Sequence, residues 1–588
     1  MSSGRPAPPP SDPPAGQTIG GRRRSMRFLR GAAATAAATA ALAVLAVLLS
    51  GASGSSGTAA QTAGSGDLAT LDSQVAKPVG VDPVRGCGQL AKENLAVDDE
   101  APAWVGSAKV VAASDGIAEH CRVVGYIEPA IRFEVNLPTD TWNGRYFQTG
   151  CGAFCGWVPA ESCIDAQRLN FATAAQNMGH DLTGVGMFSA LWARDPGLRE
   201  DFAHRSTHVT AVATKRLIEL YYGQRPERSY FGGCSSGGRE GQMEASRYPD
   251  DFDGIVSGDP AHPQRLGGVY NNWIARHSLR PDGSPIFSQA KATWLHKQVI
   301  AACDDADGLT DGLIEDPRNC TFDFADLACA SGEDAAGCLT GKELAAVKKL
   351  YGFPRNSKGR ILYPGRVELG QEMQLADAKS LGEMGQLSME WLRHAAFRKN
   401  PPGDFDFRDL DYDRDPAKLR KMLPLYEAKP DFRKFQRAGG KMLVYHGWAD
   451  IGVAPREQLD YLAEVRKRIG SQTDDTVRLF LIPGMKHCGG GVYPVDGRDV
   501  GTQSLLRMVN WVENGVAPDR LEVGYGAKGT QGGFPGPIEG PVVRNRPVFS
   551  YPQVARYDGS GSTDDAANFV PAAPPVDHTG SEDIAWKW

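Results

Sequence analysis

The chain has 588 residues, which is too long for one compact core of ordinary size. We therefore expect either one large domain with an insertion or two domains. The formal net charge of −6, with neutral histidines, provides no domain-wide basic field, and this excludes nucleic acid as an expected partner. With 9% aromatic and 23% charged residues, the composition is that of a globular protein.

Residues 1–60 are expected to be an export signal with a disordered start. An arginine-rich segment, residues 22–30, precedes an apolar run, and small residues with an A-x-A-like end follow near Ala60. This order is typical of a secreted protein, for which we expect no stable membrane association after cleavage. The alternative is an uncleaved membrane anchor, since the apolar run is about long enough to span a bilayer.

From residue 66 to residue 258, strand-like and helical segments alternate, which predicts the first part of an α/β core. Residues 130–138 and 144–150 are expected strands. Residues 208–223 have helical apolar spacing that stops at a glycine. Residues 228–233 are a short buried-type strand, and a helix follows them.

The alternation fades over residues 259–430, which are rich in Asp, Pro, Gly and aromatic residues. It returns at residues 440–450 and 477–491, so residues 431–545 are expected to be the second part of the same core. A long segment between two parts of one sheet predicts an inserted lid. Residues 546–588 are expected to be a surface tail.

The stretch at residues 233–237, Gly-Cys-Ser-Ser-Gly, fits the G-x-S-x-G pattern of a nucleophile elbow. The central serine must lie on a strained turn, and only small neighbours let the two backbones approach. The predicted strand before it and helix after it favour Ser235 as a nucleophile over a residue of a plain tight turn. Ser236 would then offer its backbone N–H to an oxyanion hole.

The second oxyanion donor should come from a glycine-rich loop after an early strand. Residues 147–157 form such a loop, and the backbone N–H of Gly152 is preferred over that of Ala153. The alternative is a purely structural glycine turn.

A serine nucleophile needs a base and an orienting acid, which follow in the order Ser, Asp or Glu, His in proteins with this type of nucleophile elbow. Asp450 ends the returning strand pattern, and His487 lies in a glycine-bounded loop. His208 and His446 suit packing or a hydrogen bond better. On spacing alone, the remaining alternatives are His180, His204 and His394.

In an exported chain, the 11 cysteines are expected to form disulfides rather than metal sites, and their odd number leaves at least one without a partner in the chain. Cys234 directly precedes Ser235, and Cys488 directly follows His487. A Cys234–Cys488 disulfide would fix the serine–histidine geometry and could stabilise the fold by about 4–5 kcal/mol. The alternative is two buried free thiols.

Taken together, these motifs resemble the tannase and feruloyl esterase family of serine hydrolases. The similarity covers the segments around Ser235, Asp450 and His487 and the early glycine loop, and hence most of the chain beyond the signal. It implies an α/β-hydrolase core with a large lid, and activity on esters of phenolic acids such as ferulate or gallate. The family also includes the enzyme that hydrolyses mono(2-hydroxyethyl) terephthalate.

The resemblance also implies a structural calcium ion in the lid, within residues 303–320. A hard cation suits crowded oxygen ligands, and the alternative is a solvated acidic loop. The expected ligands are the side chains of Asp304, Asp307 and Asp311 and the carbonyls of Leu309 and Leu313.

Three further disulfides follow from the same resemblance. A Cys303–Cys320 bridge would stabilise the calcium loop by around 3 kcal/mol. The other two implied pairs are Cys87–Cys121 and Cys329–Cys338, and the pairing of Cys151, Cys155 and Cys163 stays open.

The expected substrate is a small aromatic ester, and nothing in the sequence specifies an oligomeric state. Lid aromatics and arginines could contact the acyl group or could equally be lid core and surface residues; they are Trp391, Phe397, Phe405, Phe407, Arg393 and Arg398. Two other classes of protein share parts of this pattern. The paired cysteines and the calcium loop argue against a peptidase, and the complete triad argues against a catalytically silent, calcium-bearing binding protein.

Overall fold

The computed structural model describes residues 80–95, 101–330, 336–527, 538 and 540–576. The expected export signal, residues 1–60, lies outside the described residues. Within the described ranges, no helix is both long and apolar enough to cross a membrane.

A nine-stranded sheet organises the structure, in the order β1-β2-β3-β5-β4-β6-β7-β8-β9. Neighbouring strands are antiparallel from β1 to β5 in this order, whereas β5, β4, β6, β7, β8 and β9 run parallel. The two expected strands at residues 130–138 and 144–150 are confirmed as β3 and β4. The strands are β1 (Ala103–Val111), β2 (His120–Ile127), β3 (Ile131–Pro138), β4 (Arg145–Thr149), β5 (Ala172–Gln176), β6 (Arg228–Cys234), β7 (Gly254–Gly258), β8 (Lys441–Gly447) and β9 (Val477–Ile482).

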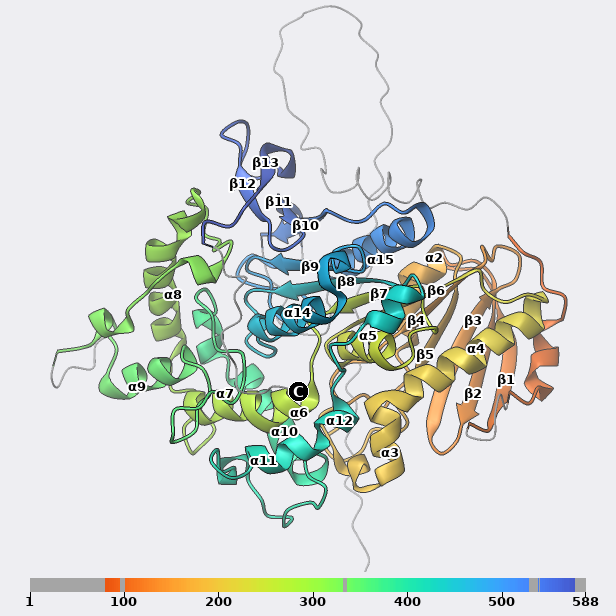
Figure 1. Ribbon diagram of the computed structural model, residues 1–588, viewed down its shortest axis with the longest axis horizontal. Helices are drawn as coiled ribbons and strands as arrows, with labels where there is room; N and C mark the ends of the chain where they lie inside the picture. Colours follow the sequence, from red (N-terminus) through yellow and green to blue (C-terminus); the bar gives the residue numbers. More distant parts are fainter. Residues whose placement is uncertain (1–79, 96–100, 331–335, 528–537, 539, 577–588) are drawn as a thin grey trace, which may run out of the picture. The chain divides into compact units, whose positions relative to one another are not determined.

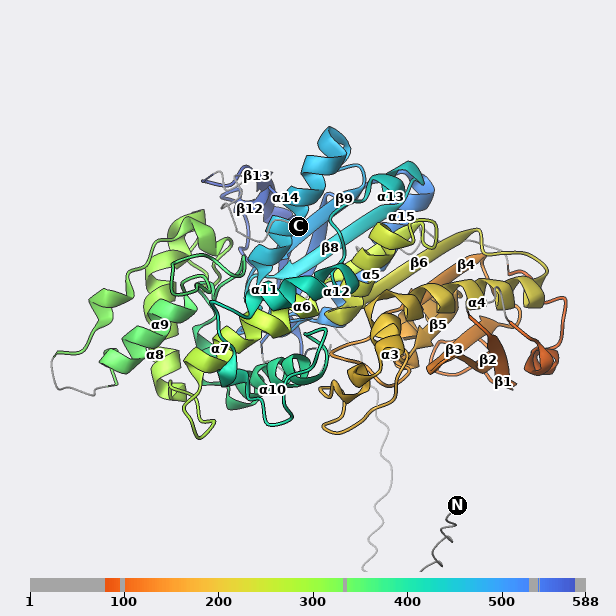
Figure 2. The ribbon, with the colours of Figure 1, turned by 60° about the horizontal axis from the view of Figure 1, so that its bottom comes forward.

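Helices cover both faces of the sheet, because parallel strands need crossover connections and successive side chains point to opposite faces (Figures 1 and 2). Phe231 of β6 packs on the face covered by α4, α5 and α14, and Tyr230 packs on the face covered by α15 and α2. The helix expected to stop at Gly223 is confirmed as α4, and Gly223 has a left-handed φ of 74°. The helices outside the segment between β7 and β8 are α2 (Ile164–Arg168), α3 (Pro196–Glu200), α4 (Ser206–Tyr222), α5 (Ser236–Arg247), α14 (Pro455–Ile469) and α15 (Gly497–Asn514).

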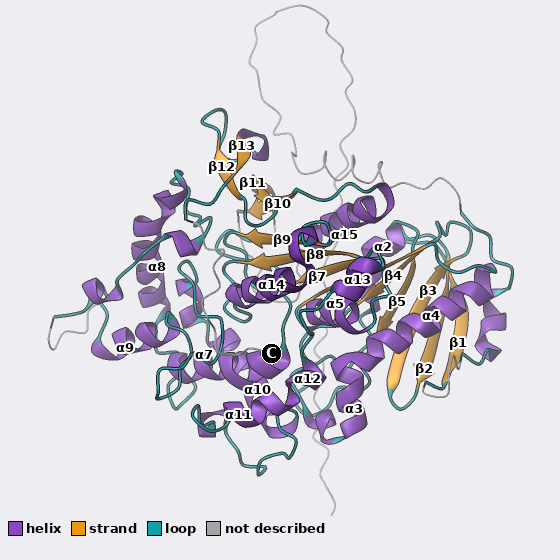
Figure 3. Cartoon of the chain, viewed as in Figure 1, coloured by secondary structure: helices purple, strands orange, loops and turns teal. Residues whose placement is uncertain are grey.

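The segment between β7 and β8, residues 259–440, is called the insert below. Its described residues form helices and turns and no strand of a sheet (Figure 3). The insert has its own buried core, in which Trp391 stacks on Phe154 from the loop after β4. Its α-helices are α6 (Pro263–Arg265), α7 (Asn271–Ser278), α8 (Gln289–Cys303), α9 (Gly341–Leu350), α10 (Ala378–His394), α11 (Pro416–Leu419), α12 (Leu423–Tyr426) and α13 (Arg433–Arg437).

The C-terminal part contains two further strand pairs, although the sequence predicts a surface tail from residue 546. β10 (Arg520–Gly526) pairs with β11 (Val542–Phe549), and β12 (Val554–Tyr557) pairs with β13 (Phe569–Ala572). Val548 of β11 is buried in the same core as α15. In β10 the alternate residues Leu521, Val523 and Tyr525 are buried, as in a strand with one face toward a core.

Candidate active site

Ser235 lies at the sharp turn between β6 and α5. Its φ of 64° and ψ of −122° fall in a sparsely populated region for a residue with a side chain. The neighbouring backbone is close enough that a Cβ on Gly150 would lie 2.5 Å from Cα of Gly237. This close approach explains why small residues surround the serine, which is itself almost fully buried.

Ser235, His487 and Asp450 form a continuous hydrogen-bonded chain. The Oγ of Ser235 lies 2.9 Å from Nε2 of His487, and Nδ1 of His487 lies 2.6 Å from Oδ2 of Asp450. The three residues follow β6, β9 and β8, whose parallel register brings their carboxyl ends to one edge of the sheet. The structure therefore brings together the three residues that the sequence singled out.

The hydrogen bonds around Asp450 keep it charged although it is fully buried. Its Oδ1 accepts bonds of 2.8 Å from the backbone N–H groups of both Gly452 and Val453. Burial opposes the charged form, but the imidazoles of His487 and His446 hold the pKa of Asp450 below its ordinary value. With Nδ1–H donated to this carboxylate, Nε2 of His487 is left to accept the proton of Ser235.

Burial likewise disfavours the charged form of His487, but the carboxylates of Asp450 and Asp259 raise the pKa of His487 above its ordinary value. The group therefore binds a proton readily. A ring with these partners can take a proton from a serine hydroxyl and then hold the resulting charge.

A second buried carboxylate, Asp259, lies behind this chain and was missed by the sequence reasoning. Its Oδ1 accepts a 2.9 Å bond from Gly447 N–H, and its Oδ2 accepts a 3.2 Å bond from Cys488 N–H. Burial raises the pKa of Asp259 to about 6, although His446 opposes the rise. A signal was present, because Asp259 directly follows β7 at the same edge of the sheet.

His446 completes this second layer. Its Nε2 lies 3.6 Å from Asp259 and 3.5 Å from Asp450. Burial would lower the pKa of His446, but these two carboxylates raise it to about 9. The expected hydrogen bond of His446 is present, since its Nε2 lies 2.9 Å from the carbonyl oxygen of Val453.

The disulfides include the four pairs expected from the sequence, Cys234–Cys488 among them. The open trio resolves into a Cys151–Cys155 disulfide and a free, buried Cys163. Cys234–Cys488 joins the end of β6 to the residue after His487 and so ties together two parts of the hydrogen-bonded chain.

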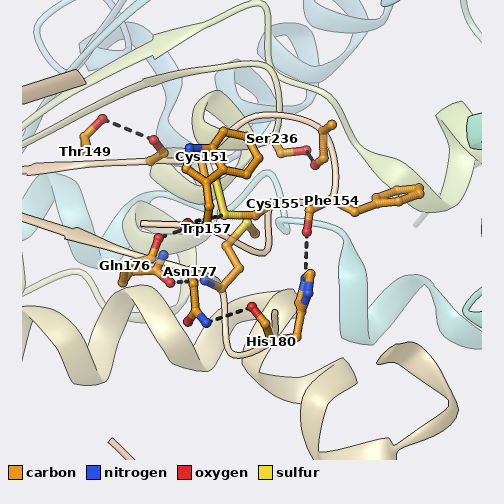
Figure 4. Close-up of a disulfide and its surroundings, with 12 residues drawn as sticks. Thr149, Cys151, Phe154, Cys155, Trp157, Gln176, Asn177, His180 and Ser236 are labelled. Carbon is orange, nitrogen blue, oxygen red and sulfur yellow. Dashed lines mark hydrogen bonds between the residues drawn. A yellow bond between two sulfur atoms is a disulfide. The ribbon is translucent and has the colours of Figure 1, made fainter. Parts of the chain in front are cut away.

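The glycine-rich loop after β4 lies against the start of α5 (Figure 4). The Oγ of Ser236 donates a 2.5 Å bond to the carbonyl of Ala153. The loop thereby sets Gly152, Ala153 and the first residue of α5 beside one another next to Ser235.

The other histidines that spacing left open have different partners. His180 bonds through Nε2 to the carbonyl of Phe154 at 2.7 Å. His204 bonds to the hydroxyl of Tyr248, and His394 lies 3.9 Å from Glu390. In the described structure the histidine bonded to Ser235 is His487.

Comparison with known proteins identifies the family. The model of the family described as "Tannase and feruloyl esterase" matches residues 114–572, which is most of the chain. The chain belongs to the tannase and feruloyl esterase family. It is therefore a carboxylic-ester hydrolase with the α/β-hydrolase type of fold.

Individual relatives of this esterase cover about four fifths of the chain. It is 31% identical over 566 residues to mono(2-hydroxyethyl) terephthalate hydrolase of Piscinibacter sakaiensis, spanning 83% of this chain and 91% of that protein. It is 33% identical over 494 residues to a probable feruloyl esterase B of Aspergillus clavatus, spanning 80% and 89%. The crystal structure of feruloyl esterase B from Aspergillus oryzae superposes with a TM-score of 0.68 at 28% identity, covering 80% of this chain and 97% of that one.

The aromatic residues weighed as substrate contacts are mostly packed inside the insert of the esterase. Trp391, Phe397 and Phe407 are buried, and the indole N–H of Trp391 donates to Oε1 of Gln264. Arg393 donates to the carbonyl of Phe405. The three buried aromatics have the contacts of core residues, and Arg398 is exposed, in line with the alternative to substrate binding.

Four of the five expected calcium ligands line one small cavity of about 20 Å³, which is room for about one water-sized sphere. They are Asp307, Leu309, Asp311 and Leu313. Asp304 is not among the lining residues, and its carboxylate accepts the N–H of Gly312 at 2.9 Å.

The chemistry of this cavity suits a hard cation. Neither the Leu309 nor the Leu313 carbonyl accepts a hydrogen bond within the described part of the chain. Burial, together with the negative charges of Asp311 and Asp304, raises the pKa of Asp307 to about 6. The hydrogen bond from the Leu309 N–H opposes this rise. Glu315 also lines the cavity and was not among the expected ligands. Asp311 additionally pairs with Arg546.

Proposed function

We propose that this esterase is exported and hydrolyses esters of aromatic acids, such as ferulate or gallate, through an acyl-enzyme on Ser235. The observation that carries the proposal is the chain of 2.9 Å and 2.6 Å contacts from Ser235 through His487 to Asp450. The choice of aromatic acyl groups is supported by membership of a family that acts on such esters.

In the proposed acylation step, Nε2 of His487 takes the proton of Ser235 while Oγ attacks the ester carbonyl. Asp450 holds the imidazole in the required tautomer and stabilises the imidazolium that forms. The ring then gives its proton to the departing alcohol. Water attacks the acyl-enzyme by the same route and releases the acid.

The oxyanion that develops on the carbonyl would be stabilised by backbone N–H groups of Ser236 and Gly152. Ser236 is the first residue of α5, so its N–H is not used within the helix and lies at the positive end of the helix dipole. Removing one such donor typically lowers the rate about 100- to 1000-fold.

Esters like mono(2-hydroxyethyl) terephthalate are the second candidate substrates. They are supported by the 31% identity to the Piscinibacter sakaiensis hydrolase over 83% of this chain. Such an acyl group carries a carboxylate that ferulate and gallate esters lack. Relative rates on the two classes therefore separate the candidates.

We further propose a structural calcium ion in the insert, held by Asp304, Asp307, Asp311 and the carbonyls of Leu309 and Leu313. The cavity lined by four of these residues supports the site, and Asp304 would have to turn from Gly312 to join them. The ion would neutralise crowded carboxylates and take no part in the reaction.

Export is supported by the five disulfides of the structure, because disulfides persist in oxidising compartments. The insert, which packs against the loop after β4, would act as the lid that shapes the acyl pocket. We therefore propose that the chain forms one α/β-hydrolase core, residues 66–258 and 431–545, interrupted by a lid of residues 259–430.

The test compares the secreted protein with Ser235→Ala on methyl ferulate, methyl gallate, mono(2-hydroxyethyl) terephthalate and p-nitrophenyl acetate. We expect hydrolysis of at least one aromatic ester, with loss of about 10⁴-fold or more in the variant. Activity on the acetate alone would reject the aromatic substrate class. No turnover of any ester would favour the catalytically silent, calcium-bearing binding protein instead.

A further inference from the structure

The loop after β4 is closed into a small ring by the Cys151–Cys155 disulfide, whose cysteines are four positions apart (Figure 4). The ring contains Gly152 and Ala153, the two residues weighed as the second oxyanion donor. Both cysteines are buried, and with Phe154 they belong to the core that the insert forms.

Most polar backbone groups of the ring are already engaged. Cys151 N–H donates to Oε1 of Glu240 at 3.0 Å, and Cys155 N–H donates to the carbonyl of Gly152 at 2.9 Å. Phe154 N–H donates to the carbonyl of Met187 at 3.0 Å. Within the described chain, the ring N–H groups left without an acceptor are those of Gly152 and Ala153. The ring thus reserves two adjacent donors beside Ser235.

The conformation that leaves these donors unused is unfavourable by itself. Ala153 has a φ of 48° and Cys155 a φ of 63°, in the left-handed region that residues with side chains rarely adopt. Such a backbone persists only where its surroundings determine it. Here the covalent bridge closes the ring across both of these residues.

Glu240 ties the ring to the helix that carries the nucleophile. It lies on α5 and is 3% exposed, and its Oε2 accepts bonds from Gln176 at 3.1 Å and from Thr207 at 2.7 Å. Its Oε1 accepts the bond from Cys151 N–H. Ser236 of the same helix donates its hydroxyl to the carbonyl of Ala153. One rigid element therefore positions Ser235, Ser236 and the ring together.

We propose that the Cys151–Cys155 bridge and Glu240 position the oxyanion hole, by holding the Gly152 and Ala153 N–H groups toward the carbonyl oxygen of an ester at Ser235. The inference rests on the proposed function. Neither the bridge nor Glu240 touches the substrate, so both are positioning residues. Their loss weakens binding of the transition state and leaves binding of the ester largely unchanged.

The experiment uses the full exported protein with Cys151→Ser/Cys155→Ser. The matched control is Cys329→Ser/Cys338→Ser, which opens another short disulfide, with cysteines nine positions apart in the insert. We measure kcat and KM on the best aromatic ester, the melting temperature, and the inhibition constant of phenylboronic acid. This acid bonds to a serine nucleophile and places a boronate oxygen where the oxyanion forms.

For Cys151→Ser/Cys155→Ser we expect kcat to fall by about 10- to 1000-fold, the upper end being the loss of one full donor. The inhibition constant of the boronic acid should rise with the fall in kcat/KM, while KM changes little. The control should keep the parent values of kcat and inhibition constant. If opening the ring changed only the stability of the fold, kcat, KM and the inhibition constant of the folded variant would keep their parent values.

Parent-like kcat and boronate inhibition in the folded double variant would overturn the inference, provided that Ser235→Ala is inactive. Full activity of Ser235→Ala would instead reject the proposed function and this inference with it. If the double variant does not fold, Glu240→Asp decides, because it shortens the tie to Cys151 while leaving the disulfide. A parent-like inhibition constant in that variant would also overturn the inference.

Discussion

At the scale of single residues, the charges behind Asp450 set the proton affinity of His487. Asp259 and His446 form a second carboxylate–imidazole pair within 3.6 Å of each other, and Asp450 lies 3.5 Å from the same imidazole. The groups that face His487 electrostatically are therefore Asp450, Asp259 and His446. Two of them are carboxylates and favour its protonated form.

This arrangement predicts a shift in the pH profile for Asp259→Asn. His487 acts as a base only when neutral, so kcat/KM falls as the pH drops through its pKa. Because the Asp259 carboxylate raises that pKa, its removal should move the acid limb of kcat/KM to lower pH. The control is Asp201→Asn, another buried aspartate that pairs with Arg205. An unmoved limb, or a limb moved to higher pH, would contradict this role of Asp259.

Ser235, Asp450 and His487 could be predicted because each directly follows a strand pattern and carries a local motif. Glu240 could not, because its role depends on contacts with Cys151, Gln176 and Thr207, which are distant in the sequence. A glutamate on a helix gives no local sign of burial. Tertiary contacts alone define such residues.

At the scale of elements, the loop of residues 303–320 carries the residues of the proposed calcium site. Four expected ligands line one cavity, and the Cys303–Cys320 bridge closes the loop that carries them. Glu315 of the same loop contacts β12, since its Oε1 accepts the N–H of Ala555 at 2.9 Å. An ion in the cavity would therefore join the insert to the C-terminal strands.

Removing calcium should lower the melting temperature without changing kcat at 25 °C. A ligand present at a hundred times its dissociation constant raises the free energy of unfolding by about 2.7 kcal/mol. EDTA, which removes free calcium, should abolish a contribution of this order. Asp307→Asn should abolish the response to calcium. Asp305→Asn is the control, because the exposed Asp305 is not among the expected ligands. Equal melting temperatures with calcium and with EDTA would reject the site.

Strong local patterns predicted β3, β4, β6 and α4, whereas β5 and the C-terminal strands were not anticipated. β5 reads Ala-Thr-Ala-Ala-Gln, a sequence with little preference for a strand, and it is buried between β3 and β4. Its place in the sheet, and not its composition, makes it a strand. β12 and β13 similarly depend on pairing with each other.

At the scale of the whole molecule, Cys234–Cys488 connects the two parts of the sheet that the insert separates. The cysteines are 254 positions apart, so the bridge constrains a large part of the unfolded chain. The bridge also lies beside Asp259, whose carboxylate accepts the N–H of Cys488. Cys488 is thus joined both to β6 by the disulfide and to the end of β7 by a hydrogen bond.

Opening this bridge in Cys234→Ser/Cys488→Ser should lower the free energy of unfolding by about 5 kcal/mol in the chain-entropy model. The matched control is Cys87→Ser/Cys121→Ser, whose cysteines are 34 positions apart. Its smaller loop predicts a smaller loss, of about 4 kcal/mol. Urea unfolding of both variants measures the two losses. The loop-length account is wrong if Cys87→Ser/Cys121→Ser is the more destabilised variant.

The most direct test of the central claim is to map the covalent adduct of a fluorophosphonate by peptide mass spectrometry. We predict one adduct per chain, on Ser235 and not on the adjacent Ser236, with ester hydrolysis lost in proportion to labelling. Ser235→Ala should take up no label. An adduct on another residue, or full hydrolysis by the labelled protein, would contradict the assignment of Ser235 as the nucleophile.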